Sequence, residues 1–148
     1  MKKLSIAVIF FLTTAASAFA KPAGTAPAFR GQEDFNKRFP NATEVNCKAY
    51  GQFTDVTFTW NGLQLQAFYT EEGDPIATAR YILFSNLPLS VQMSLRKQYA
   101  DFTDTQIIEY NDENEGLSYY VTEVGLKTSY MLHVSTSGTI SVFKKMKD

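Results

Sequence analysis

The residue types that most often perform enzyme chemistry are scarce in this 148-residue chain. His133 is the only histidine and Cys47 the only cysteine. His133 lies between Leu132 and Val134 in a run typical of a strand, and no G-x-S-x-G nucleophile motif occurs. A zinc site needs three or four nitrogen or sulfur ligands, which these two residues do not supply. The sequence therefore predicts no catalytic residue, no metal site and no cofactor, and favours a protein that is not an enzyme.

Two acidic segments could carry chemistry, one as a calcium site and the other as paired catalytic acids. The segment Asn111–Gly116 contains Asp112, Asn114 and Gly116, an order similar to part of a calcium loop, but it lacks the closing bidentate acid. A solvated hairpin tip explains it as well as calcium does. The segment Glu71–Asp74 is predicted to be a second tip, and nothing in the sequence pairs its acids for general acid–base work.

Cys47 allows two interpretations. Because it has no second cysteine to pair with, no disulfide forms within the chain, and the fold must depend on burial of apolar side chains. In an oxidising compartment such a cysteine could bridge two chains or act as a reactive thiol. Its place in the strand-like run VNCKAY favours the other interpretation, a small, buried hydrophobic residue.

The first residues predict export. Lys2 and Lys3 precede an apolar segment, Leu4–Leu12, that is too short to span a bilayer with ordinary flanks, and Ala18–Ala20 forms an A-x-A cleavage site. We therefore expect residues 1–20 to be a signal peptide and residues 21–28 a flexible leader, in a periplasmic or secreted protein. A retained amino-terminal anchor is the alternative.

The charge balance excludes some partners. The chain has 14 Lys and Arg residues against 15 Asp and Glu residues, without a block of like charge. Nucleic acid is therefore not an expected partner, and no integral membrane segment is expected once the signal peptide is removed. The partner we expect is a protein or peptide of the cell envelope.

Hydrophobic periodicity predicts one helix and four strands, and then the same order again. Helices are expected at Gly31–Phe39 and from Leu87-Pro88 onward. Asn61-Gly62 is a strong hairpin signal between two alternating runs. The expected strands are Thr43–Tyr50, Val56–Trp60, a strand from Leu63 through Tyr69, Ile76–Leu83, Thr105–Tyr110, Leu117–Val124, Lys127–Ser135 and Thr139–Phe143.

The two halves correspond residue by residue at several positions. Phe35 corresponds to Leu95, and Gly73 corresponds to Gly138. This pattern predicts an α+β fold, made by tandem duplication of a helix plus a four-stranded antiparallel sheet unit. Residues 29–148 would form one domain of two repeats, about 29–84 and 85–148. Because each repeat is small, we expect the two to share one sheet or one core.

Several of these motifs resemble a known family. The stretch FPNATEV after a helix, the Asn-Gly hairpin, Ala67 and Tyr69 before the Gly73 turn, and a helix from Leu-Pro to KQY are similar to the PepSY-like, beta-lactamase-inhibitor-like family of exported bacterial proteins. The resemblance covers Gly31 to Phe143. It implies α+β repeats like those of the secreted beta-lactamase inhibitory proteins and of peptidase propeptides.

Strand alternation predicts which sheet face remains open for a partner. The residues expected to face the helices are Val56, Phe58, Trp60, Leu63, Leu65 and Tyr69. The residues expected on the open face, and therefore the candidate partner-binding residues, are Thr57, Thr59, Gln64, Gln66, Phe68, Tyr120, Met131 and His133. An ordinary solvated sheet is the alternative interpretation of this face. The two acidic tips are the other candidate contact sites.

Three functions remain open at this stage. The first is an exported non-enzymatic binding module, inhibitory or regulatory toward an envelope protein or peptide, that uses the open sheet face. The alternative is a periplasmic carrier or sensor of a small apolar ligand, because the chain is rich in aromatic residues. The third is a hydrolase of an unrecognised type.

Overall fold

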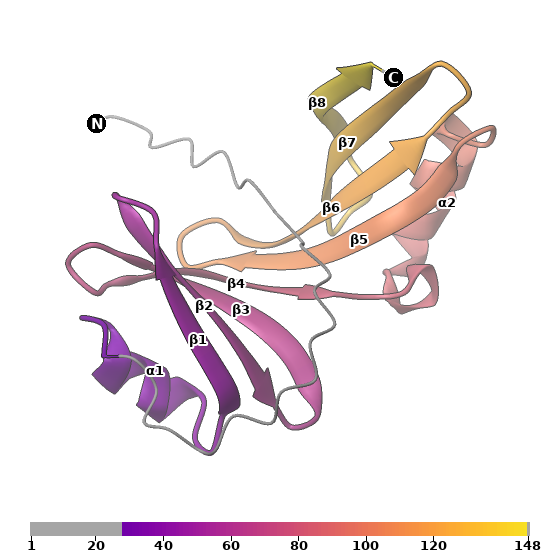
Figure 1. Cartoon of the computed structure of the whole chain (residues 1–148). Coiled ribbons are helices and arrows are strands. Elements are labelled where there is room, and N and C mark those ends of the chain that lie inside the picture. The colour runs from indigo at the N-terminus through magenta and orange to yellow at the C-terminus, as the bar shows by residue number, and fades with distance from the viewer. Residues whose placement is uncertain (1–27, 148) are drawn as a thin grey trace.

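A computed structural model of the chain describes residues 28–147, so the predicted signal peptide and residues 21–27 of the predicted leader lie outside the described residues. Ten regular elements and one short 3₁₀ turn follow in the predicted order (Figure 1). They are α1 (Gln32–Arg38), β1 (Thr43–Ala49), β2 (Phe53–Trp60), β3 (Leu63–Thr70), β4 (Pro75–Tyr81), η1 (Phe84–Asn86), α2 (Leu89–Gln98), β5 (Thr103–Asp112), β6 (Gly116–Val124), β7 (Thr128–Ser135) and β8 (Ile140–Lys147).

The predicted pair of helix plus four-stranded units is wrong. All eight strands form one antiparallel sheet in the order β1 to β8. The two halves join where β4 pairs with β5, with Ala79 opposite Tyr110 and Tyr81 opposite Ile108, and these strands lie side by side in the middle of the sheet (Figure 1). Two separate units would each have exposed an additional strand edge, whose backbone groups lack partners. Pairing β4 with β5 removes both edges.

Helix α1 covers the first strands through an aromatic cluster. Phe35 is 1% exposed, and its ring lies 4.8 Å from that of Phe58 on β2 and 5.4 Å from that of Phe39. Trp60 is half-buried at the edge of this cluster, and its indole Nε1 donates a hydrogen bond of 3.0 Å to the Pro40 carbonyl. Leu63, predicted to face inward, is 48% exposed beside the Asn-Gly turn.

Cys47 contacts the same cluster from β1. The side chain is half-buried against the residues under α1. Burial raises the pKa of its thiol, which disfavours the reactive thiolate. This position agrees with the interpretation of Cys47 as a small hydrophobic residue.

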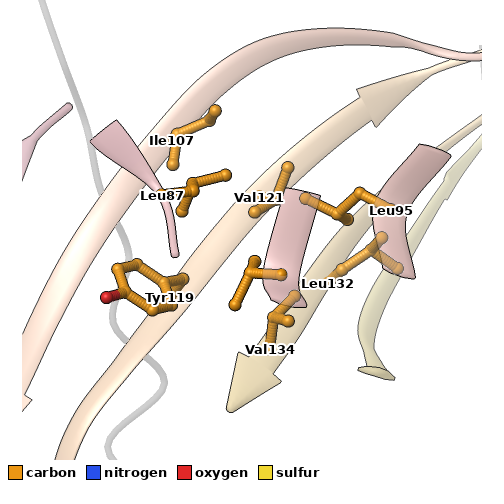
Figure 2. Close-up of a cluster of buried hydrophobic side chains, with 8 residues drawn as sticks. Leu87, Leu95, Ile107, Tyr119, Val121, Leu132 and Val134 are labelled. Carbon is orange, nitrogen blue, oxygen red and sulfur yellow. The ribbon is translucent and has the colours of Figure 1, made fainter. Parts of the chain in front are cut away.

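Helix α2 covers the last strands through an aliphatic cluster. Leu87 precedes the helix, and Val91 and Leu95 point from it onto the sheet. Figure 2 shows Leu87 and Leu95 with side chains of β5, β6 and β7 around them. The strand residues in this cluster are Ile107, Tyr119, Val121, Leu132 and Val134. Tyr119 and Val121 therefore face the helix, which leaves Tyr120 between them on the open face.

Both helices lie on the same face of the sheet, and polar contacts connect the halves between them. Cross-strand pairing links Ala67 under α1 to Thr78 and then to Asn111, which shares its side of β5 with Ile107 under α2. Between the two clusters, Arg80 Nε lies 2.6 Å from Glu109 Oε1. A polar contact across the β4–β5 pairing therefore lies between the two apolar clusters of the helix-covered face.

The centre of the opposite face is apolar. Phe68 on β3, Ala77 and Ala79 on β4, and Ile108 and Tyr110 on β5 form a third buried cluster, and no residue of α1 or α2 belongs to it. Large side chains on neighbouring strands of a twisted sheet lie close enough to cover one another. The core therefore changes sides in the middle of the sheet, where the open face carries apolar packing.

Candidate functional site

A polar groove lies on the open face of the first four strands. Cross-strand pairing brings Thr57 opposite Gln66 and Thr59 opposite Gln64, with Ala79 as the next neighbour of Gln66. The groove has a volume of about 460 Å³. Its open-face lining consists of Glu44, Asn46, Lys48, Tyr50, Asp55, Thr57, Thr59, Gln64, Gln66, Ala79 and Tyr81. Phe58, Leu65 and Arg80 also border it, although they belong to the helix-covered side of their strands.

Hydrogen bonds fix several groups of the groove. The Thr59 hydroxyl donates to Glu44 Oε2 at 2.7 Å, and the Gln66 amide donates to Asp55 Oδ2 at 3.3 Å. Burial raises the pKa of Asp55, while the bond from Gln66 and the charge of Lys48 oppose this effect. The floor of the groove therefore presents carboxylate and amide groups in orientations set by their neighbours, which suits hydrogen bonding to a polar segment.

An irregularity of β1 brings Glu44 into the groove. The pairing of β1 with β2 shifts register between Thr43 and Asn46, and Glu44 has a φ of +53°. A β-bulge of this kind turns a side chain away from strict alternation. At the same edge, the Lys48 ammonium lies 4.9 Å from the centre of the Tyr50 ring, a cation–π contact.

A strip of rings continues the open face toward β8. The Tyr120 ring lies 5.6 Å from the ring of Tyr110, 5.1 Å from that of His133 and 5.2 Å from that of Phe143. Burial raises the pKa of both Tyr110 and Tyr120, so these phenols stay neutral at physiological pH. The strip is a packed aromatic surface, partly exposed at Phe143.

The predicted binding residues fall into two groups. The four polar residues Thr57, Thr59, Gln64 and Gln66 lie together in the groove. Tyr120 and His133 contact each other in the aromatic strip, and Met131 lies on the same side of β7 as His133, between Thr122 and Lys144. Their role in binding stays a prediction.

Phe68 differs from the other candidates because it is only 7% exposed. Its ring lies 6.2 Å from that of Phe53, and it packs in the third cluster with Ala77 and Ile108. The alternation placed it on the open face, but packing on that face hides most of it. Phe68 is thus a supporting residue, and its removal would leave a cavity.

Sequence reasoning missed several groove residues. Asp55 and Tyr81 share the open side of their strands with Thr57 and Ala79, so extending the alternation would have identified them. Glu44 had no such signal, because the bulge interrupts the alternation of β1.

The acidic tip Asn111–Gly116 makes contacts that stabilise the fold. Asp112 Oδ1 accepts hydrogen bonds from the backbone N–H groups of Asn114 at 2.8 Å and Glu115 at 3.0 Å, as a turn-forming aspartate does. Glu113 Oε1 lies 2.6 Å from Arg38 Nη1 at the end of α1. Over residues 28–147, no group of three or more His, Cys, Asp or Glu side chains is arranged to hold a metal ion.

Comparisons with known proteins identify the fold. No family model matches the sequence, and no curated protein matches it. A BLIP-like protein of Bacteroides fragilis NCTC 9343 has a TM-score of 0.73 at 19% identity, over 84% of this chain and 90% of that chain. A DUF2874 family protein of Bacteroides ovatus ATCC 8483 has a TM-score of 0.72 at 16% identity, over 84% and 89% of the two chains.

A third solved structure has a similar fold. A protein of Bacteroides eggerthii DSM 20697, named provisionally as periplasmic, has a TM-score of 0.71 at 13% identity, over 84% of this chain and 90% of that one. Within the described part of this chain, no helix is both long enough and apolar enough to cross a membrane. The structural matches confirm the expected resemblance to beta-lactamase-inhibitor-like (BLIP-like) proteins. This chain has the fold of the BLIP-like and DUF2874 family proteins of Bacteroides.

Proposed function

We propose that this chain is an exported, non-enzymatic binding module that holds a polar segment of an envelope protein or peptide in the groove on its open face. The observation that supports this proposal most strongly is the groove itself, about 460 Å³ in volume and lined by side chains of four adjacent strands. Both helices pack on the other face, so neither described helix occupies it. The BLIP-like name of a structural neighbour is consistent with binding.

The chemistry of the groove favours a peptide segment over the alternative, a small apolar ligand. Apolar ligands bind in cavities lined mainly by hydrophobic side chains. This groove instead presents carboxylates from Glu44 and Asp55, amides from Gln64 and Gln66, and the ammonium of Lys48. A backbone segment with polar side chains would satisfy these groups, whereas an apolar ligand would leave them without partners.

Replacing Gln64 with arginine should weaken partner binding at least tenfold, which corresponds to about 1.4 kcal/mol. Gln64 is exposed at the groove, so the longer side chain would occupy it beside the two carboxylates without disturbing the core. The measurement is quantitative capture from an envelope extract with the mature protein, followed by titration of each captured protein against wild type and Q64R.

The matched control is Gln98→Arg. Gln98 is also exposed, but it ends α2 on the covered face of the sheet. A true groove partner is retained by wild type and Q98R and is lost by Q64R, while all three proteins keep the same thermal midpoint. A partner that binds Q64R as tightly as wild type would exclude the groove, and the aromatic strip or the acidic tips would become the next candidates.

Export is tested separately. The A-x-A site at Ala18–Ala20 predicts that amino-terminal sequencing of exported protein begins at Lys21. The reason is that signal peptidase cleaves after small residues that follow an apolar core. Protein that begins at Met1 in the envelope fraction would contradict this expectation and favour the retained anchor.

A further inference from the structure

An acidic pair is buried beneath the end of α2, far along the chain from the groove residues. Glu123 on β6 is 0% exposed, and neither of its carboxyl oxygens has a hydrogen-bond partner if both are treated as acceptors. Asp104 is its direct neighbour across the β5–β6 pairing. Oδ1 of Asp104 is buried and also lacks a partner. Buried polar atoms without partners are rare in folded proteins, so three of them around one pair require an explanation.

Within residues 28–147, one cation is in direct contact with the pair. Arg96 on α2 places Nη2 2.6 Å from Asp104 Oδ2. The other titratable groups that face the pair are the phenols of Tyr99 at the end of α2 and Tyr130, which is paired with Glu123 on β7. Farther out, Lys145 of β8 lies 5.8 Å from the centre of the Tyr130 ring. One guanidinium therefore faces two carboxyl groups.

Aromatic rings limit the access of water to this site. The Phe102 ring lies 5.4 Å from that of Tyr99 and 5.7 Å from that of Tyr130. Two ionised carboxylates side by side in such surroundings repel each other, and each also loses its hydration. A proton on Glu123 removes the charge repulsion and lowers the cost of lost hydration. The Glu123 O–H can then donate a hydrogen bond to Asp104 Oδ1, which gives two of the three partnerless atoms a partner.

We propose that Glu123 is protonated at neutral pH and shares its proton with Asp104, and that this carboxyl pair, with Arg96, forms a pH-sensitive clasp between α2 and the sheet. Burial, and then the neighbouring Asp104, raise the pKa of Glu123 from 4.5 to about 8, while Arg96 acts in the opposite direction. While the proton is present, Arg96 and the carboxyl pair hold α2 against the sheet. Loss of the proton leaves two buried negative charges and weakens the contact between α2 and the sheet.

The sign of the pH dependence follows from this proton. Between about pH 4.5 and about pH 8 the folded chain holds a proton on Glu123 that the unfolded chain has released. Stability falls with rising pH wherever the folded state binds more protons. The contribution of Glu123 is therefore fully present below pH 4.5, declines through this window and is lost above about pH 8.

The test is the substitution Glu123→Gln, which imitates the protonated acid and cannot ionise. At pH 5 the thermal midpoints of E123Q and wild type should agree closely. At pH 9 the midpoint of E123Q should be higher by at least about 4 °C. The control is Glu72→Gln in an exposed turn, which should follow wild type at every pH. An E123Q midpoint equal to or below that of wild type at pH 9 would overturn the proposal.

A second measurement needs no substitution and covers the case in which E123Q does not fold. Carbon-13 NMR of the glutamate side-chain carboxyl groups in the wild-type protein reports each titration directly. We expect one glutamate to titrate with a midpoint above pH 6 in the folded protein. If every glutamate titrates below pH 6, Glu123 is ionised at neutral pH and the clasp does not exist.

Discussion

Phe35→Ala should reduce the free energy of unfolding by about 3–5 kcal/mol. Helix α1 is only seven residues long, too short to be stable by itself, so it depends on packing against the sheet. Phe35 is its only buried side chain, and its ring contacts those of Phe29, Phe39 and Phe58. The measurement is urea unfolding of the mature protein, with Asn36→Ala, on the exposed side of the same helix, as the control within about 0.5 kcal/mol.

The same experiment tests the single sheet. Trp60, the only tryptophan, reports on the first half, whereas circular dichroism reports on all eight strands. Because β4 pairs with β5, we expect Phe35→Ala to shift both signals together in one transition. A Trp60 transition that moves alone would show that the halves unfold as separate units, contrary to the continuous pairing.

Gly73→Ala should cost about 2–4 kcal/mol, more than the same change at Gly62. Both glycines have positive φ, +100° and +77°, so both substitutions strain the backbone by about 1–2 kcal/mol. Only Gly73 also lacks space, because an added Cβ would lie 2.7 Å from the carbonyl carbon of Arg30 and 2.9 Å from the backbone nitrogen of Gly31. A Cβ at Gly62 would contact nothing within 4 Å.

The difference between the two variants isolates the packing of the β3–β4 turn against the segment that leads into α1. It is measured as the difference in unfolding free energy of Gly73→Ala and Gly62→Ala under the same conditions. Equal losses at the two positions would mean that the close approach at Gly73 is relieved without cost. In that case the turn does not hold the start of α1.

Local signals were sufficient to predict most elements. The hairpin at Asn61-Gly62 has positive φ at both residues, as the dipeptide predicts. Alternation correctly separated Val56 and Phe58, under α1, from Thr57 and Thr59 in the groove. These predictions succeed because turn chemistry and side-chain direction in a strand depend on a few neighbouring residues.

The candidate site was predicted only in part, for reasons that particular residues show. Gln64 and Gln66 were identified because they lie in a regular strand. Glu44 was not, since its direction depends on a bulge in the pairing of β1 with β2. Phe68 was assigned to the correct face but to the wrong degree of exposure, because its neighbours Ala77 and Ile108 come from other strands.

The order of helices and strands, the hairpin turns and the two sides of the regular strands could be predicted from the sequence, because all of these arise from interactions within a few residues. Tertiary structure alone decided that β4 pairs with β5, that apolar packing at the centre lies on the open face, and that Glu123 meets Asp104 beneath α2. These outcomes depend on which distant segments come together, and the cost of leaving backbone or carboxyl groups without partners selects among the possible arrangements.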